Sequence, residues 1–586
     1  MAGIVARATS CRRVAFLGCD AMMGGEAFRT IVGAKLARDG GLIADEYFPD
    51  VPGSNCRSEP ARDGGLTADE YFPDLLGSNC GSWLAGDGAL IADEILYGVH
   101  IHSCGNDGYW FRFYSQPFQG LRLNSPQNPA RVMKTMWAEV LARFEKKAPA
   151  SVMAKLILEQ AVPAEWVDQV FEEHRQRQYP RELLFSTIVE LMSLVALGLR
   201  PSLHAAARQM EDLPVTLAAL YDKVSRTEPA LLRALVTGSA ERLAPSIQEL
   251  GCSAILPGWQ LRIVDGNHLP STEKRLGALR RERGAARPGF SVVVYDPDLD
   301  QIVDLQPCED AYASERVSVL PLLACATEGQ LWMADRLYCT LPVMQACEES
   351  GASFIVRQQS HHPRLIQEGD WQESVPVATG TVREQTIELK GGHRWRRVEL
   401  NLQTPTESGD SVMWFWSNLP ESISAEQIAD LYRRRWSIEG MFQRLESVLD
   451  SEIESLGSPR AALLGFASAV LAYNVLAVLK RSVEQAHRET QAEGWEASTF
   501  HLAVQVRSGF EGLQIALPSD AQLIQSSSET LSQRLLTLAR MIKPKQVAKS
   551  VRGPKIAKPK EWLEGKAANA HVSTDRVLKA SKKKTP

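Results

Sequence analysis

The stretch SAEQIADLYRRRWSIEGMFQRLESVLD, residues 424–450, decides the fold and predicts one long helix. Ser424 is followed three residues later by Gln427, which is the spacing of a helix capping box. At about 100° per residue, an apolar stripe faces the core and consists of Leu431, Ile438, Phe442, Leu445 and Leu449. A second stripe along its shoulder carries Tyr432, Arg435, Glu439 and Glu446. These polar residues fit either a solvated flank with local ion pairs or the wall of a cleft.

Two upstream carboxylates each follow a short apolar run. The run 260–264 predicts a strand that ends at Asp265, which Gly266 follows, and the run 331–334 predicts a strand that ends at Asp335. A carboxylate at a strand end beside open backbone suits a metal site at a sheet edge. Between them, residues 290–296 and 301–305 predict two more strands. The acidic turn DPDLD (296–300) could suggest a calcium loop, but a hairpin turn is favoured because the EF-hand Gly and Glu are lacking.

The spacing of Tyr432, Arg435 and Glu439, Y-(2)-R-(3)-E, resembles the signature of the IS4-type bacterial DDE transposases. The segment DGNHLPSTEKRLGALR (265–280) resembles the first-Asp block of that family, and DRLY (335–338) resembles its second-Asp block. The family pattern continues with a Lys seven residues after the Glu, where this chain has Glu446. The role of that Lys is therefore not carried over.

The resemblance implies an α/β fold: a ribonuclease-H-like catalytic core with a β-strand insertion subdomain, preceded by a helical domain. It implies that Asp265, Asp335 and Glu439 are catalytic and hold two Mg²⁺ ions, with Mn²⁺ as a substitute. Asp265 would bridge the ions, and the other two carboxylates would each hold one. Such an ion pair stabilises the attacking and leaving oxygens of phosphoryl transfer.

Four residues are candidates for binding DNA. Arg435 and Arg336 would neutralise phosphates, and Tyr432 would position DNA beside the metal ions. Trp395 is flanked by Arg394 and Arg396, and an aromatic among Arg residues suits stacking on an unpaired base. The alternative for Trp395, as for the other Trp residues of the insertion, is packing in a small core.

The predicted organisation has seven parts. They are a repeat-containing extension that is disordered or non-native (1–132), a helical DNA-binding domain (133–255), the first part of the core (256–357), the β-strand insertion (358–420), the second part of the core with the Glu helix (421–490), a helical region (491–540) and a basic tail (541–586). Within the helical domain, residues 202–225 predict two short helices around Pro214. They fit a DNA-reading helix-turn-helix or an ordinary bundle, and the lack of a basic face favours the bundle.

The first 132 residues contain a repeat with a period of 24 residues. RDGGLIADEYFPDVPGSNC (38–56) recurs almost unchanged as RDGGLTADEYFPDLLGSNC (62–80), and a weaker copy begins at Gly86. A small solenoid or an acidic interaction arm would fit. We favour translated upstream repeat DNA, with the functional start at Met133 or Met136, since Gly, Asp, Pro and Asn make a poor core.

Composition bounds the remaining choices. The 586 residues are 44% apolar, enough for several domains, and no apolar run predicts a membrane span. Ten Cys residues without metal-ligand spacing and no clear secretory signal predict a cytoplasmic, nucleoid-associated protein. The formal charge of −5 is unevenly distributed: residues 541–586 are strongly basic, which predicts a disordered arm that contacts phosphate or, alternatively, a solubilising tail.

The predicted function is that of a DDE transposase of an IS4-type insertion sequence. The resemblance implies binding to terminal inverted repeats, Mg²⁺-dependent cleavage and strand transfer. The partners would be double-stranded DNA, both transposon ends and target, and a second copy of the chain in a synaptic homodimer. The alternative is a catalytically inactive DNA-binding relic or regulator, which the Glu446 departure favours.

Overall fold

The computed structural model describes residues 5–10, 13–15, 99–103, 109–113 and 129–583, without 180–181, 211–212, 271–275, 407–408, 454, 518–528 and 551–570. The chain divides into two units, 1–143 with 515–517 and 144–514 with 518–586. The two repeat copies at 38–56 and 62–80 lie outside the described residues. The predictions made for them stay untested.

The first unit contains a four-stranded antiparallel sheet in the order β2-β1-β4-β3. Its strands are β1 (Val5–Ser10), β2 (Arg13–Ala15), β3 (Val99–Ser103) and β4 (Tyr109–Phe113). Helix α4 (Pro129–Lys147) begins in this unit and continues into the second.

The second unit begins with helices at the predicted positions. They are α5 (Pro149–Ala161), α6 (Ala164–His174), α7 (Phe185–Ala196), α8 (Leu203–Gln209), α9 (Leu217–Arg226) and α10 (Pro229–Glu249). Helix α8 packs on α7, and α9 packs on the later helix α16 (Pro459–His487). The two short helices around Pro214 are therefore members of a helical bundle, the favoured alternative.

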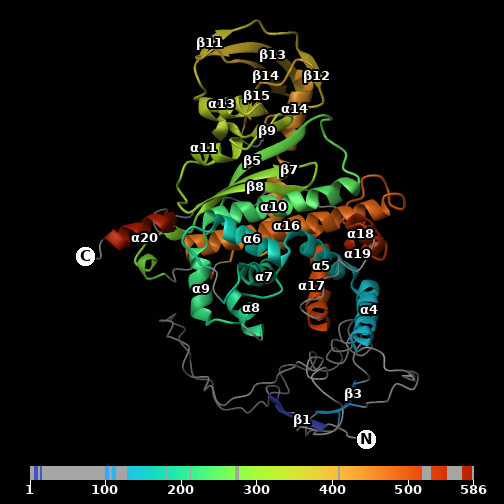
Figure 1. Cartoon of the computed structure of the whole chain (residues 1–586). Coiled ribbons are helices and arrows are strands. Elements are labelled where there is room, and N and C mark those ends of the chain that lie inside the picture. The colour runs from blue at the N-terminus through green and yellow to red at the C-terminus, as the bar shows by residue number, and fades with distance from the viewer. Residues whose placement is uncertain are drawn as a thin grey trace, which may run out of the picture. The chain divides into compact units, whose positions relative to one another are not determined.

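One sheet of ten strands organises the second unit (Figure 1). Its order is β11-β13-β14-β15-β10-β9-β5-β7-β8, with β12 paired to β13. The strands are β5 (Gln260–His268), β7 (Phe290–Asp296), β8 (Gln301–Cys308), β9 (Gln330–Ala334), β10 (Ser353–Arg357), β11 (Leu365–Glu368), β12 (Val375–Val377), β13 (Gly380–Leu389), β14 (Arg394–Leu402) and β15 (Val412–Ser417).

Strands β5, β9 and β10 are parallel, whereas β7 and β8 join β5 as an antiparallel meander. One face of these strands packs against α12 (Leu320–Leu323) and α13 (Leu341–Glu349), with Phe290, Phe354 and Trp332 in the shared core. The arrangement of a central mixed sheet with helices is consistent with a ribonuclease-H-like DDE domain. The β7–β8 connection is a hairpin, as predicted.

The strands of the predicted insertion extend the main sheet. Strand β15 pairs with β10 through Ile355, Val356 and Arg357, and β14 and β13 follow outward. The sequence predicted a β-strand insertion subdomain, with packing in a small core of its own as the alternative for its Trp residues. Instead, Trp395 and Trp416 belong to the same buried cluster as Phe354 of β10, because the shared sheet makes the two cores continuous.

The predicted single helix over 424–450 is two helices, α14 (Ala425–Arg434) and α15 (Ser437–Val448). The capping box of Ser424 and Gln427 is present. The break lies at Arg435 and Trp436, where Arg435 N–H donates to Tyr432 O over 3.0 Å and closes a tight turn. The predicted apolar residues Leu431, Ile438, Leu445 and Leu449 are buried, while Phe442 is only partly buried.

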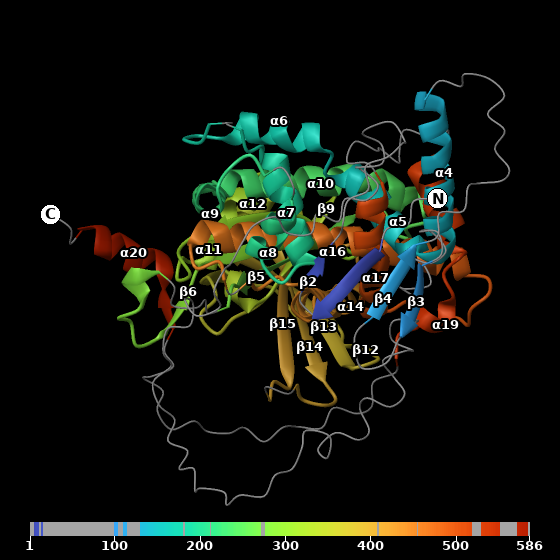
Figure 2. The same cartoon turned by 90° about the horizontal axis from the view of Figure 1, so that it is seen from below.

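Helix α16 joins the bundle to the sheet. Figure 2 shows it beside α10, which it contacts. Its buried Asn474 accepts from Ile302 N–H and donates to Ile302 O, both over 2.9 Å. These two bonds satisfy the backbone groups of Ile302 on the edge strand β8. Among the described helices, α16 alone is long and apolar enough to cross a membrane, but 94% of its apolar window is buried inside the protein. We therefore describe it as a core helix.

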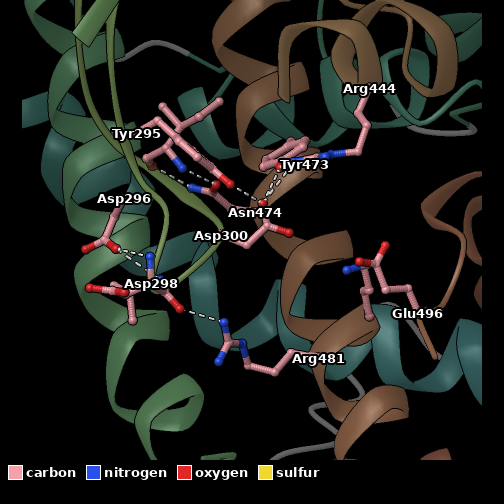
Figure 3. A network of polar contacts seen from close by, with 12 residues as sticks. Tyr295, Asp296, Asp298, Asp300, Arg444, Tyr473, Asn474, Arg481 and Glu496 are labelled. Atoms are coloured by element: carbon pink, nitrogen blue, oxygen red, sulfur yellow. Dashed lines mark hydrogen bonds and ion pairs between the residues drawn. The ribbon is translucent and has the colours of Figure 1, made fainter. Parts of the chain in front are cut away.

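Asp300 anchors the β7–β8 hairpin to α15 and α16 (Figure 3). Its Oδ1 accepts hydrogen bonds from the Tyr295 and Tyr473 hydroxyls, each over 2.6 Å, and pairs with Arg444 Nη2 at 3.0 Å. Burial works against the charge, but Arg444, Lys480 and the two hydroxyls hold the pKa of Asp300 below its usual value. Asp300 lies in the left-handed backbone region, at φ 52°, which Asp tolerates better than most residues.

The C-terminal part of the chain contains α17 (Thr499–Ala516), α18 (Leu531–Ala539) and α19 (Pro544–Val547). The prediction of a disordered arm is wrong for residues 571–583. They form β16 (His571–Ser573), parallel to β6 (Ala285–Arg287), and then α20 (Thr574–Lys583). The physical reason is Asp310, which accepts from the Ser573 hydroxyl and from Arg576 Nε, each over 2.8 Å.

Candidate active site

Two carboxylates lie side by side where the pairing of β5 with β9 ends. The last paired residues of these parallel strands are Val264 and Ala334. Asp265 comes next in β5, and Asp335 directly follows the end of β9. Asp335 then caps the 3₁₀ turn η4 (Arg336–Tyr338), since its Oδ1 accepts from Leu337 N–H over 2.7 Å. The strand predicted to end at Asp265 instead continues to His268, because β7 keeps pairing with it.

Arg435 joins the first of these carboxylates to Glu439. The break between α14 and α15 turns Arg435 inward, where it is only 8% exposed. Its Nη1 lies 3.4 Å from Asp265 Oδ2, and its Nη2 lies 3.1 Å from Glu439 Oε1. Burial works against the charge of this guanidinium, but Tyr432, Asp265, Glu439 and Asp335 hold its pKa above the usual value. Asp265, Asp335, Arg435 and Glu439, which come from three distant parts of the sequence, therefore lie close together.

The environment of Asp265 disfavours the charged form of its carboxyl group. Burial raises the pKa of Asp265 to about 6, and the nearby carboxylates of Asp335 and Glu315 add to the rise. Arg435 and the Gly266 N–H, which donates to Oδ1 over 2.9 Å, offset only part of it. A cation close to Asp265 and Asp335 would remove this penalty.

The donors at this place fit a hard divalent cation in chemistry. Mg²⁺ and similar ions use one or two carboxylates and keep several waters, and Asp265 with Asp335 provides such a pair. Arg435 lies between Asp265 and Glu439 and pairs with both, so the convergence of the three carboxylates on shared ions stays a prediction. Within the described residues, no three His, Cys, Asp or Glu side chains are grouped closely enough to hold a metal ion.

Comparison with known proteins identifies the fold that carries this group. Residues 258–475 match the family model of the transposase DDE domain. This chain has a DDE transposase domain. The chain is also similar to "Putative transposase y4zB" of Sinorhizobium fredii, with 24% identity over 231 residues that cover 38% of this chain. The match spans 61% of that relative, about three fifths of its length. Domains of this family generally use divalent metal ions.

Two of the predicted DNA-binding residues are buried within the DDE domain. Trp395 is 1% exposed, its Nε1 donates to Glu348 Oε1 over 3.1 Å, and its ring meets Phe354 edge-on. The prediction that Trp395 stacks on a base is therefore wrong, because the shared sheet encloses it. Tyr432 is 3% exposed and stacks on Phe415 at 4.5 Å between ring centroids. It supports the Arg435 turn and does not reach the surface.

Two other residues lie at the surface of the site. Arg336, predicted to bind phosphate, is exposed directly after Asp335. Trp436 was not predicted; it is 59% exposed and follows Arg435 in the turn between α14 and α15. The sequence carried a signal for it, since Trp436 lies four residues after Tyr432 and shares its helical stripe. A continuous helix gave no reason to prefer Trp436 over the Trp residues of the insertion.

The raised pKa of Asp265 predicts a pH-dependent stability in metal-free protein. An acid whose pKa is about 6 in the folded state and near 3.8 in the unfolded state favours folding at low pH. That contribution is lost as the pH rises through 6. We expect Asp265→Asn to stabilise the EDTA-treated protein, with a gain about 1.4 kcal/mol larger at pH 8 than at pH 5. Urea unfolding of both proteins at the two pH values measures this, and an equal gain at both would contradict it.

Proposed function

We propose that this chain is a DDE transposase of an IS4-type insertion sequence, which binds terminal inverted repeats and catalyses metal-dependent DNA cleavage and strand transfer. One observation carries the proposal: Asp265 and Asp335 adjoin at the end of the β5–β9 pairing, inside a DDE domain, with Arg435 and Glu439 in reach. Carboxylates held together by a rigid sheet are what phosphoryl transfer by metal ions requires.

Asp265 and Asp335 would hold the divalent ion, Mg²⁺ with Mn²⁺ as a substitute, and Glu439 would complete the set. When bound, the metal would activate the attacking oxygen and stabilise the leaving oxygen. Glu439 is 61% exposed, and among the described residues its carboxylate pairs with Arg435, so its side chain could turn toward the two aspartates once that contact is released. The catalytic roles of all three residues belong to this proposal.

Arg435 would exchange its carboxylate partners for a DNA phosphate. A guanidinium binds phosphate and carboxylate oxygens with the same planar donors. Entry of a phosphate at the site would draw Arg435 away from Asp265 and Glu439, which would free both carboxylates for the metal. Arg336, exposed beside Asp335, would contact a neighbouring phosphate. In this view, the ion pairs of Arg435 are the resting arrangement before DNA binds.

The wider assembly rests on the family resemblance. The partners would be double-stranded DNA, as transposon ends and as target, and a second copy of this chain in a synaptic homodimer. A catalytically inactive DNA-binding relic or regulator is the second candidate. It is favoured by Glu446, an exposed acidic residue where the family has Lys, and by the closed ion pairs of Arg435.

The deciding experiment is cleavage of a duplex that carries the inverted repeats flanking the gene. The full chain is incubated with the end-labelled duplex in Mg²⁺, in Ca²⁺ and in EDTA. A transposase would leave a 3′-hydroxyl nick at the repeat boundary in Mg²⁺ and only bind the duplex in Ca²⁺. Binding of the same duplex without cleavage in Mg²⁺ or Mn²⁺ would favour the relic, and failure to bind it would overturn both candidates.

Trp436 is the aromatic that we propose for stacking on an unpaired base. It is 59% exposed, lies beside Arg435 and follows the exposed Arg433 and Arg434. Stacking of one base on an aromatic ring contributes about 1–3 kcal/mol, so Trp436→Ala should weaken binding of the end duplex by about 5- to 150-fold. Fluorescence anisotropy in Ca²⁺ measures this affinity. Phe500→Ala, which removes an aromatic that is 51% exposed on α17, is the matched control and should change it less than 2-fold.

A further inference from the structure

A third carboxylate, Glu315, links the two segments that carry the aspartates. It begins the short helix α11 (Glu315–Ser318), after β8, and its side chain is 16% exposed. Its Oε1 lies 3.3 Å from His268 Nε2, and its Oε2 accepts from the Tyr338 hydroxyl over 3.1 Å. His268 lies three residues after Asp265, and Tyr338 lies three residues after Asp335. One carboxylate therefore contacts strand β5 and the turn η4, in each case three residues beyond the aspartate.

The backbone at Gly266 makes room for this contact. A Cβ on Gly266 would lie 2.5 Å from Glu315 Cδ, a separation that no side chain could keep. Side chains alternate along a strand, so positions 266 and 268 share one face of β5 and Asp265 lies on the other. Glu315 thus packs directly against the backbone that follows Asp265. Glu315 therefore affects the position of Asp265 through the backbone of β5 and not through a hydrogen bond to its side chain.

The turn after Asp335 is held from the same short helix by a second residue. Arg316 Nε donates to Leu337 O over 2.8 Å, and Asp335 Oδ1 accepts from Leu337 N–H. Tyr338 is fully buried, so its hydroxyl depends on Glu315 as its acceptor. Helix α11 therefore fixes the position of η4, and η4 fixes the rotamer of Asp335.

We propose that Glu315 is a positioning residue that sets the spacing of Asp265 and Asp335 for a divalent metal ion. This inference rests on the proposed function of the same site. Glu315 holds His268 and Tyr338 and is not itself a metal ligand. Partners that orient metal-binding side chains typically matter by about 10- to 100-fold in metal affinity or activity.

The test compares Glu315→Ala, Glu315→Gln and the control Glu309→Ala in the full chain. Glu309 lies six residues before Glu315 in the sequence and pairs with Arg460 at 3.0 Å, not with His268 or Tyr338. Mn²⁺ affinity is measured from the paramagnetic signal of the free ion, and kcat and KM are measured for end cleavage. We expect Glu315→Ala to bind Mn²⁺ about 10- to 100-fold more weakly and to lower kcat, with KM for DNA within about 2-fold. Glu315→Gln should fall between wild type and Ala, and Glu309→Ala should match wild type.

The outcomes separate this inference from the proposed function. If wild-type protein binds Mn²⁺ and Glu315→Ala weakens that binding, the positioning role holds even where no DNA is cleaved, and only the proposed function fails. Mn²⁺ affinity unchanged in both Glu315 variants would overturn the inference while leaving cleavage by wild type intact. If Glu315→Ala does not fold, Glu315→Gln and Tyr338→Phe decide, since each removes one part of the link. Wild-type Mn²⁺ affinity in both variants would overturn the positioning role of Glu315.

Discussion

Asp265→Asn is expected to lower the rate of metal-dependent end cleavage by at least about 10³-fold, equivalent to about 4 kcal/mol of transition-state stabilisation. The substitution keeps the size of the side chain but removes the charge that would hold the metal. Asp265 lies beside Asp335 and faces Arg435, so its carboxylate is central to the proposed metal site. Single-turnover cleavage of the end-labelled duplex at saturating protein isolates the chemical step from DNA binding.

The same measurements distinguish lost chemistry from lost structure. Binding of the duplex in Ca²⁺ should stay within about 3-fold of wild type, because the substitution leaves the proposed DNA contacts of Arg336 and Trp436 unchanged. Asp370→Asn, which changes an exposed Asp after β11, is the matched control and should cleave at the wild-type rate. Cleavage by Asp265→Asn within 10-fold of wild type would contradict the proposed role of Asp265.

The positions of the two aspartates could be predicted because strand patterning is local. Short apolar runs before Asp265 and Asp335 gave the strands β5 and β9, and parallel neighbours bring equivalent ends together. The hairpin at 296–300 followed in the same way. Alternating polar and apolar residues likewise predicted the β-strand insertion over 358–420, where β13, β14 and β15 lie. These features depend on residues close together in the sequence.

The break of the Glu helix could not be predicted from helical periodicity. Residues 424–450 fit one uninterrupted helix, and nothing in the sequence from Arg433 to Trp436 breaks a helix as Pro or Gly would. At this turn, buried Arg435 contacts Asp265, which is 170 residues earlier in the chain and which local patterning does not include. Helical periodicity places Arg435 on one stripe with Tyr432 and Glu439, but it does not show that Asp265 is its partner.

Glu315 and Trp395 also show that long-range contacts cannot be predicted from local sequence patterns. Glu315 has no motif around it, and its importance comes from His268 and Tyr338, which lie in two other segments. The flanking Arg residues suggested that Trp395 stacks on a base, but in a strand the side chains of adjacent residues point to opposite faces. Its burial follows from the pairing of β15 with β10, a long-range contact that single-sequence patterns do not encode.

Asp300→Ala is expected to destabilise the protein by about 3–5 kcal/mol, because it leaves the partly buried Arg444 without its carboxylate and deprives the buried Tyr295 and Tyr473 hydroxyls of their acceptor (Figure 3). Asp300→Asn keeps a side chain that tolerates the positive φ and can still accept from the hydroxyls, so it should cost less, about 1–2 kcal/mol. Urea unfolding measures both. Asp430→Ala removes the carboxylate of an exposed ion pair with Arg433 and should cost less than about 0.5 kcal/mol. Equal losses for Asp300→Ala and Asp430→Ala would show that the hairpin does not depend on this anchor. Its attachment to α16 would then rest on apolar packing and on other polar contacts, such as those of Asn474 with Ile302 and of Arg481 with Asp298 O.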